Sequence, residues 1–199
     1  MRRGTVVIFV KAPVAGRVKT RLGREIGMGR AAALFRILTS HTLREAEKSG
    51  FRVVLAVDPP GAAKEGARFW PPHLRRIAQG RGDLGDRMAR VFRHARGPVV
   101  IIGADAPGLR ARHLRRAFAA LKGSDAVFGP AEDGGYWLIG LNGRRAAPDL
   151  FAGVRWSTKH ALKDTLETLP KSFNVAMLER LRDVDEAADL EAMVFSSRA

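Results

Sequence analysis

The chain has 199 residues, of which 46% are hydrophobic, and this is enough to form one well-buried domain over residues 1–199. Its 35 Lys and Arg residues outnumber 20 Asp and Glu residues and give a net charge of +15. The arginines are nevertheless scattered, and no recognition motif accompanies them, so we do not expect specific nucleic-acid binding. The absence of cysteine excludes a disulfide framework, a thiolate nucleophile and a zinc–thiolate site.

The sequence carries no pattern typical of a membrane or secretory segment. No apolar stretch approaches the roughly 20 residues of a membrane span. The apolar run over 5–10 is too short for the core of a signal peptide. We therefore expect a cytoplasmic protein without a membrane span, whose oligomeric state the composition leaves open.

Apolar runs and helical periodicities alternate along the first half of the chain. Residues 5–10 form a continuous β-branched and aromatic run typical of a buried parallel strand, and Pro13 breaks the pattern soon afterwards. The elements expected next are a loop over 11–22, a helix over 28–48 closed by Gly50, a strand over 52–57, a loop with at most one helical turn over 61–72, and a short strand over 74–78.

The second half continues the alternation around a strongly apolar segment. Residues 98–103, PVVIIG, are the best candidate for a central strand, and Asp105 follows this strand at its carboxyl end. The other expected elements are a helix from Asp83 to about 95, a helix over 110–121, a strand over 125–128, a strand entered through Asp133 and ending at Leu141, a loop over 142–156, a helix over 158–169, a strand over 173–178 and a helix from 186. The alternation predicts a three-layer α/β/α fold with a mostly parallel sheet.

The loop after the first strand, KAPVAGRVKTRL, carries a glycine and four cations. These residues are Gly16, Lys11, Arg17, Lys19 and Arg21. Such a loop is suited to hold phosphates through side-chain charge and exposed backbone N–H groups. It matches neither the P-loop pattern nor the dinucleotide-binding GxGxxG pattern. A solvated basic loop without a ligand is the alternative interpretation.

Acidic side chains stand near three further predicted strand ends. They are Asp105 in GADAPGL, Glu132 and Asp133 beside Gly134 and Gly135 in GPAEDGGYWLIGL, and Asp183 and Asp185 in DVDEAADL. Each has a simpler interpretation: a helix cap, or, for the segment with Gly134 and Gly135, a hairpin or strand-entry turn whose glycines only supply positive φ. Together with the basic loop they form a coherent set, because Mg²⁺ or Mn²⁺ is usually held by one or two carboxylates plus substrate phosphates.

Six motifs together resemble a family of small bacterial proteins described as glycosyltransferases or nucleotide-diphospho-sugar transferase-like proteins with the GT-A fold. In chain order they are KAPVAGRVKTRL, GDLGDRM, GADAPGL, GPAEDGGYWLIGL, FAGVRWST and DVDEAADL. The resemblance covers about residues 6–192, nearly the whole chain. More distantly, the KTRL loop, the strand-end Asp and the DVD…DL ending are similar to guanylyl- and cytidylyltransferases, including 2-phospholactate guanylyltransferase.

The resemblance implies a GT-A fold and a role for each motif. It implies that the loop over 11–21 faces the nucleotide and its phosphates, and Asp83 of GDLGDRM is assigned to the same side. It implies that Asp105 is the metal-binding acid, and by the nucleotidyltransferase analogy Asp185 is the second carboxylate for Mg²⁺ or Mn²⁺. Asp133 becomes a candidate for acceptor binding or for the role of general base. The acceptor and sugar side is assigned Glu132, Gly134, Gly135 and Trp156.

Some residues keep two interpretations. Trp156 either packs in the core or stacks on a sugar or base. Ser157 is interpreted as the N-cap of the following helix and not as a nucleophile. The five histidines show no HxxxH spacing and are expected on the surface or on helix faces. Ala104, Ala106 and Gly108 stand where the family is expected to carry polar or acidic side chains, so that only one acid of a DxD motif remains.

The motifs predict an enzyme that binds a nucleotide-diphospho-sugar donor and Mg²⁺ or Mn²⁺, and transfers a glycosyl group to an unidentified small-molecule acceptor. A nucleotidyltransferase that releases pyrophosphate is the alternative prediction. A third alternative is a non-catalytic nucleotide-sugar-binding protein that has lost part of its metal site. The release of a nucleoside diphosphate or of pyrophosphate distinguishes the two enzymes.

Overall fold

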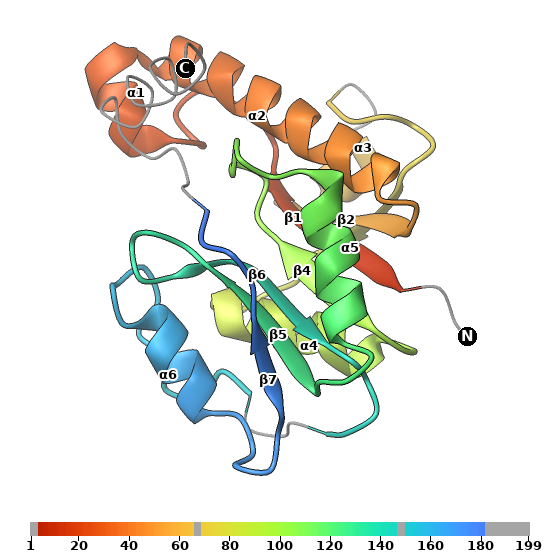
Figure 1. The fold of residues 1–199 in the computed structure, drawn as a ribbon. Helices are drawn as coiled ribbons and strands as arrows, with labels where there is room; N and C mark the ends of the chain where they lie inside the picture. Colours follow the sequence, from red (N-terminus) through yellow and green to blue (C-terminus); the bar gives the residue numbers. More distant parts are fainter. Residues whose placement is uncertain (1–3, 66–68, 147–149, 182–199) are drawn as a thin grey trace, which may run out of the picture.

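A seven-stranded sheet crosses the protein in the order β3-β2-β1-β4-β6-β5-β7 (Figure 1). The computed structural model describes residues 4–65, 69–146 and 150–181. The strands are β1 Thr5–Lys11, β2 Arg52–Asp58, β3 Arg75–Ala78, β4 Val99–Ile102, β5 Ala126–Pro130, β6 Tyr136–Leu141 and β7 Val175–Met177. The helices are α1 Thr20–Ile26, α2 Met28–Lys48, α3 Ala62–Glu65, α4 Leu84–His94, α5 Ala111–Ala120 and α6 Ala161–Glu167. The predicted α/β class and mostly parallel sheet are confirmed.

Apolar residues cover both faces of the sheet, which explains the continuous apolar runs of the central strands. On one face, Val6 and Ile8 of β1 pack in a cluster that includes α2 and α5. On the other face, Val7 of β1 packs in a cluster that includes Met88 of α4 and residues of α6. Figure 1 shows α2 and α5 on one side of the sheet and α4 on the other.

Strand β6 runs against its two neighbours, β4 and β5, whereas the other strand pairs are parallel. The alternation of strands and helices did not predict this reversal. Its physical reason is the short connection over 131–135, because a parallel connection needs a crossover of about a dozen residues or more. In register, Leu138 pairs with Ile102 and Tyr136 with Pro130. The start of β6 therefore lies at the edge where β1, β4 and β5 end.

Helix α1 corrects the prediction of a loop over 11–22, because this helix already begins at Thr20. Its N-cap, Lys19, has a left-handed backbone (φ 46°, ψ 47°) and no side-chain capping bond, so the sequence contains no start signal for it. The helix is held by packing: Leu22 is fully buried, and α1 contacts α2 directly after Gly27. Packing between elements stabilises this helix, and local sequence patterns do not predict such packing.

At the carboxyl-terminal end, α6 begins three residues after the expected start at 158 and ends before 169. The helix expected from 186 lies outside the described residues. Among the helices in the described ranges, none combines the length and apolarity that crossing a membrane requires.

Candidate active site

A cavity of about 660 Å³ opens at the edge where β1 and β4 end and β6 begins. Its lining residues are Phe9, Lys11, Arg17, Val18, Lys19, Thr20, Arg21, Phe35, Gly103, Ala104, Asp105, Asp133, Ser157, Thr158 and Lys159. The volume falls within the range of small-molecule sites. The position is the one at which open α/β sheets bind ligands, outside the carboxyl ends of parallel strands.

Cationic side chains dominate the lining. Within the described chain they are Lys11, Arg17, Lys19, Arg21 and Lys159. Lys11 is the last residue of β1, while Arg17 lies in the following loop and Arg21 in the first turn of α1. The side chains of these three residues are exposed to solvent. This arrangement suits a ligand that carries several negative charges, such as a nucleotide with its phosphates.

Lys19 and Asp105 form an ion pair within the cavity. Nζ of Lys19 donates to Oδ2 of Asp105 over 2.5 Å, and the two side chains are 6% and 29% exposed. The left-handed backbone of Lys19 is costly for a residue with a Cβ atom, and such conformations concentrate at functional sites. The pair joins two segments that lie 86 residues apart in the sequence, the KTRL loop and the end of β4.

The turn over 131–135 carries Asp133 into the cavity lining. The N–H group of Gly135 donates to Oδ1 of Asp133 over 2.8 Å, which fixes one carboxylate oxygen. Gly134 has φ of 86°, and a Cβ atom at this position would overlap the backbone of Lys159. Glycine is required here both by the backbone conformation and by the close approach of the neighbouring segment.

The segment over 155–160 forms a further part of the wall and is held from outside the cavity. Arg155 donates from Nε and Nη2 to the two oxygens of Asp164, each over 2.8 Å. These hydrogen bonds are the main reason why the pKa of Asp164 lies far below its ordinary value. The ring of Trp156 packs against Phe151 at 5.7 Å between centroids. Ser157, which lines the cavity, has a left-handed backbone with φ of 59°.

The structure brings six of the predicted site residues into the cavity lining: Lys11, Arg17, Lys19, Arg21, Asp105 and Asp133. Four others belong to the same turns without being part of the described lining: Gly16, Glu132, Gly134 and Gly135. Asp83 caps α4 in a reciprocal pair with Asp86, at 2.8 and 3.1 Å. Trp156 contacts the core beside the cavity. Asp183 and Asp185 lie outside the described residues.

Sequence reasoning missed several lining residues. Phe9 and Phe35 belong to apolar runs, and nothing in those runs distinguishes a cavity-lining aromatic residue from a core residue. The interpretation of Ser157 as an N-cap is wrong, because His160 occupies the N-cap of α6. The WST motif was nevertheless a usable signal, since Ser157, Thr158 and the following Lys159 all line the cavity.

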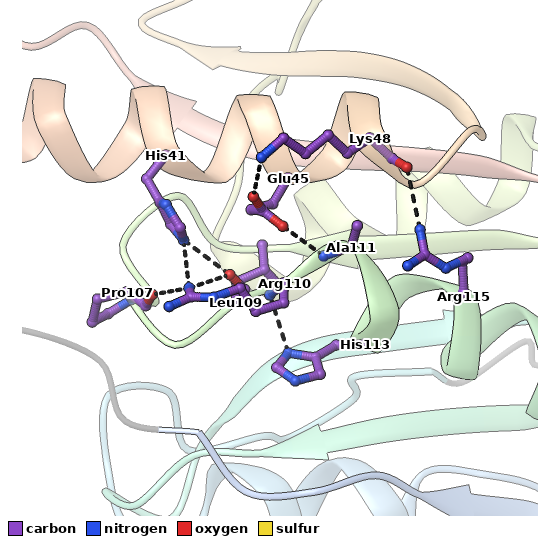
Figure 2. A network of polar contacts seen from close by, with 9 residues as sticks. All are labelled: His41, Glu45, Lys48, Pro107, Leu109, Arg110, Ala111, His113 and Arg115. Atoms are coloured by element: carbon purple, nitrogen blue, oxygen red, sulfur yellow. Dashed lines mark hydrogen bonds and ion pairs between the residues drawn. The ribbon is translucent and has the colours of Figure 1, made fainter. Parts of the chain in front are cut away.

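Figure 2 shows the polar contacts that connect α2 to the loop carrying Asp105. The carboxylate of Glu45 accepts from Nζ of Lys48 and from the N–H group of Ala111, each over 2.9 Å. These two hydrogen bonds lower the pKa of Glu45. Helix α5 has no acidic residue in its first turn, so Glu45 supplies the negative group that stabilises its N-terminus. Arg110 completes the connection by donating from Nη1 to the carbonyl oxygens of Pro107 and Leu109, each over 2.8 Å.

His113 lies on a helix, α5, as expected for the histidines, but on a face of that helix that is buried. It is 1% exposed, and its Nδ1 accepts from the N–H group of Arg110 over 3.2 Å. Its Nε2 lies 3.2 Å from Oε1 of Glu179, the second residue after the end of β7. Desolvation lowers the pKa of His113; Glu179 opposes this effect, and arginines 110, 112 and 116 reinforce it.

Asp105 fits a role as one carboxylate ligand of a divalent cation. It is partly exposed, lines the cavity and lies beside cations that suit phosphates. No group of three or more His, Cys, Asp or Glu residues suited to a metal ion occurs among the described residues. A Mg²⁺ or Mn²⁺ ion would therefore depend on substrate oxygens for much of its coordination, as is usual for Mg²⁺ at phosphate sites.

The fold and the cavity define an α/β protein of the nucleotide-diphospho-sugar transferase-like fold, and the predicted GT-A class is confirmed. The chain belongs to the DUF2064 family, described as uncharacterized proteins conserved in bacteria, whose model matches residues 42–158. No curated protein sequence matches the chain significantly.

Solved structures with similar folds include the following three. One is a Desulfovibrio desulfuricans G20 protein whose name proposes nucleotide-diphospho-sugar transferase activity; it is 31% identical, with 97% of this chain and 87% of that chain covered and a TM-score of 0.87. Another is the Mycobacterium tuberculosis H37Rv protein Rv0371c in complex with manganese; it is 18% identical, with 98% of this chain and 99% of that chain covered and a TM-score of 0.57. A third is a nucleotidyl transferase from Methanothermobacter thermautotroptrophicus; it is 14% identical, with 97% of this chain and 96% of that chain covered and a TM-score of 0.65.

Proposed function

We propose that this protein is a metal-dependent transferase that uses a nucleotide-diphospho-sugar donor and transfers the glycosyl group to a small-molecule acceptor. One observation carries the proposal: the basic loop after β1, Asp105 after β4 and Asp133 before β6 line a single cavity. The similarity to the Desulfovibrio desulfuricans protein, at 31% identity over nearly the whole chain, supports the same class of donor. In this proposal residues 1–199 act as one catalytic domain.

The donor diphosphate lies against Lys11, Arg17 and Arg21 in the proposed complex. Their charges stabilise the nucleoside diphosphate as it leaves, which is electrostatic catalysis by groups fixed before the reaction. A Mg²⁺ or Mn²⁺ ion held by Asp105 would add positive charge at the same phosphates. The similarity to Rv0371c, solved as a manganese complex, supports testing Mn²⁺ first.

Asp133 accepts the proton of the acceptor hydroxyl in this mechanism. The hydroxyl oxygen bonds to the anomeric carbon of the donor sugar, and the bond from that carbon to the diphosphate oxygen breaks. The electron pair of the broken bond leaves with the nucleoside diphosphate, and the proton passes to the carboxylate. Gly135 holds Oδ1 of Asp133 over 2.8 Å, which orients the carboxylate for this transfer.

A nucleotidyltransferase is the second candidate, and the number of cations favours it. Four basic side chains of the loop and first turn over 11–21 line the cavity, which suits a triphosphate as well as a diphosphate. In that reaction an acceptor phosphate attacks the α-phosphorus of a nucleoside triphosphate, and pyrophosphate leaves. The third possibility, a nucleotide-sugar-binding protein without catalysis, differs from both enzymes by the absence of turnover.

Thermal unfolding in the presence of nucleotides tests the proposal. The ligands are nucleoside di- and triphosphates and UDP-, GDP-, ADP- and CDP-sugars, each with and without Mn²⁺ or Mg²⁺. A ligand at 100 times its Kd stabilises the folded state by about 2.7 kcal/mol, which raises the Tm of a chain of this size by about 5–10 °C. A metal-dependent shift with one nucleotide-sugar, followed by release of nucleoside diphosphate, is the expected result.

Two matched variants make the test specific for the cavity. Arg21→Ala removes a lining cation and should weaken nucleotide binding about tenfold. Arg24→Ala, three residues further along α1 and also exposed, lies outside the lining and should leave binding unchanged. Preference for a triphosphate with pyrophosphate release would favour the second candidate, and binding without turnover the third. If no nucleotide shifts the Tm, all three are rejected.

A further inference from the structure

A second polar wall of the cavity is separate in sequence from the basic loop over 11–21. It consists of Ser157, Thr158 and Lys159, which are exposed to solvent and line the same cavity as Asp133. In the part of the chain that the structure describes, the ammonium group of Lys159 has no ion-pair partner. This wall therefore offers a positive charge to whatever enters the cavity.

Contacts outside the cavity hold the backbone of this wall in place. The paired hydrogen bonds between Arg155 and Asp164 anchor one end of the segment. The N–H group of Leu162 donates to the carbonyl oxygen of Gly134 over 3.1 Å, and Gly134 approaches the backbone of Lys159 closely. The wall and the turn that carries Asp133 are therefore joined directly, so their side chains keep a fixed relation to each other.

The side chains of the wall differ in what they can still bind. Thr158 already donates from Oγ1 to the carbonyl oxygen of Arg155 over 2.8 Å, so its hydroxyl serves the segment itself. Ser157 has the left-handed backbone that costs energy for a residue with a Cβ atom, and surrounding structure must maintain it. Ser157 and Lys159 are thus the hydroxyl and the ammonium group presented to a ligand.

We propose that Ser157 and Lys159 form an anion subsite for the acceptor, which therefore carries a phosphate or carboxylate group. The role of acceptor rests on the proposed function, whereas anion binding by this wall does not. A donor diphosphate bound against the loop over 11–21 does not neutralise the positive charge of Lys159, whereas an anionic group on the acceptor does. Anchoring that group beside Asp133 also positions a hydroxyl of the same molecule for proton transfer.

The test uses inorganic phosphate as the probe and the backbone amide signals of the full chain in NMR titrations as the readout. Two groups of amides report separately, residues 16–21 for the basic loop and residues 157–159 for the proposed subsite. Lys159→Ala should weaken the phosphate response at 157–159 about tenfold and leave that at 16–21 unchanged. Lys163→Ala, an exposed lysine of α6 outside the cavity lining, is the matched control and should change neither response.

The outcomes separate this inference from the proposed function. A response at 16–21 alone, or one at 157–159 that Lys159→Ala does not weaken, overturns the subsite and leaves the proposed donor site standing. A response at 157–159 alone supports the subsite and counts against the proposed phosphate loop. The titration is repeated with glycolate to identify the anionic group of the acceptor. Tighter binding of phosphate at 157–159 indicates a phosphate group, and tighter binding of glycolate indicates a carboxylate group. If neither probe binds at 157–159, the subsite is rejected.

Discussion

Replacing Lys19 by Met tests whether the ion pair with Asp105 organises the cavity. Methionine keeps an unbranched side chain of similar length and removes the ammonium group. The side chain of Lys19 is 6% exposed and that of Asp105 is 29% exposed. Exposed ion pairs contribute about 0–1 kcal/mol, and removing one partner of a buried pair costs about 3–5 kcal/mol. Because the side chain of Asp105 is partly exposed to water and that of Lys19 is nearly buried, we expect a loss of about 2 kcal/mol in the free energy of unfolding, or about 4–8 °C in Tm for a chain of this size.

A double-mutant cycle with Asp105→Asn isolates the contribution of the pair from other effects of either substitution. Urea unfolding followed by circular dichroism gives the four free energies, and we expect a coupling of about 1–2 kcal/mol. Lys163→Met is the control, because Lys163 lies 3.9 Å from Glu167 and both side chains are mostly exposed, so its loss should stay below about 0.5 kcal/mol. A Lys19–Asp105 coupling below about 0.5 kcal/mol would refute the reasoning.

The same variants show whether Asp105 can bind a metal ion. In the wild type, Mn²⁺ must compete with the ammonium of Lys19 for Oδ2 of Asp105. In Lys19→Met this competition is absent, and Mn²⁺ alone should raise the Tm more than in the wild type. The shift should disappear when Asp105→Asn is added. Equal shifts in all three proteins would mean that Mn²⁺ binds elsewhere.

Three further substitutions test the groups that support the cavity. Glu45→Ala removes the carboxylate that caps α5 and should lower the free energy of unfolding, measured by urea titration, by about 1–2 kcal/mol. Glu47 is more exposed, and Glu47→Ala, the control, should change the free energy of unfolding by less than about 0.5 kcal/mol. Burial lowers the pKa of His113 from its ordinary value of 6.5, so the unfolded chain binds a proton at this residue more readily, and the free energy of unfolding should fall as the pH drops below 6.5. His113→Gln should reduce the slope of the free energy of unfolding against pH in this range. An unchanged slope would exclude His113 as the cause. Gly134 and Gly153 both have positive φ, 86° and 70°, but only a Cβ atom at 134 would meet a neighbouring backbone. Gly134→Ala should therefore destabilise the protein more than Gly153→Ala does. Equal losses of Tm in thermal unfolding would show that the backbone conformation alone determines the cost.

Most of the fold could be predicted because each central strand is a short continuous apolar run. The run over 98–103 contains β4, and the run over 5–10 contains nearly all of β1. Helix α1 could not be predicted, because it is short, lacks a capping residue and is held by the burial of Leu22 against neighbouring elements. The start of α6 was misplaced for a related reason: Ser157 and Thr158 are good capping residues by type, yet both belong to the cavity wall.

The candidate site was predictable where charge is concentrated in sequence and hidden where it is assembled from distant segments. Four cations of the basic loop stand out in the sequence, and the structure places them in the cavity lining. Lys159 does not stand out, because its neighbours in the cavity come from other parts of the chain. Phe35 is similar, since its place in the apolar stripe of α2 is also consistent with a purely structural role. Only contacts over long sequence distances identify these residues.

The reversed direction of β6 explains how Asp133 and Asp105 can share one cavity. In a fully parallel sheet, a residue that precedes a strand lies at the amino edge, whereas a residue that follows a strand lies at the carboxyl edge. Asp133 precedes β6 and Asp105 follows β4, so parallel strands would place them at opposite edges. Because β6 is antiparallel to β4, with Leu138 opposite Ile102, the turn before β6 returns to the carboxyl edge. The reversal of β6, which the alternation of strands and helices did not predict, is therefore what brings Asp133 to the cavity.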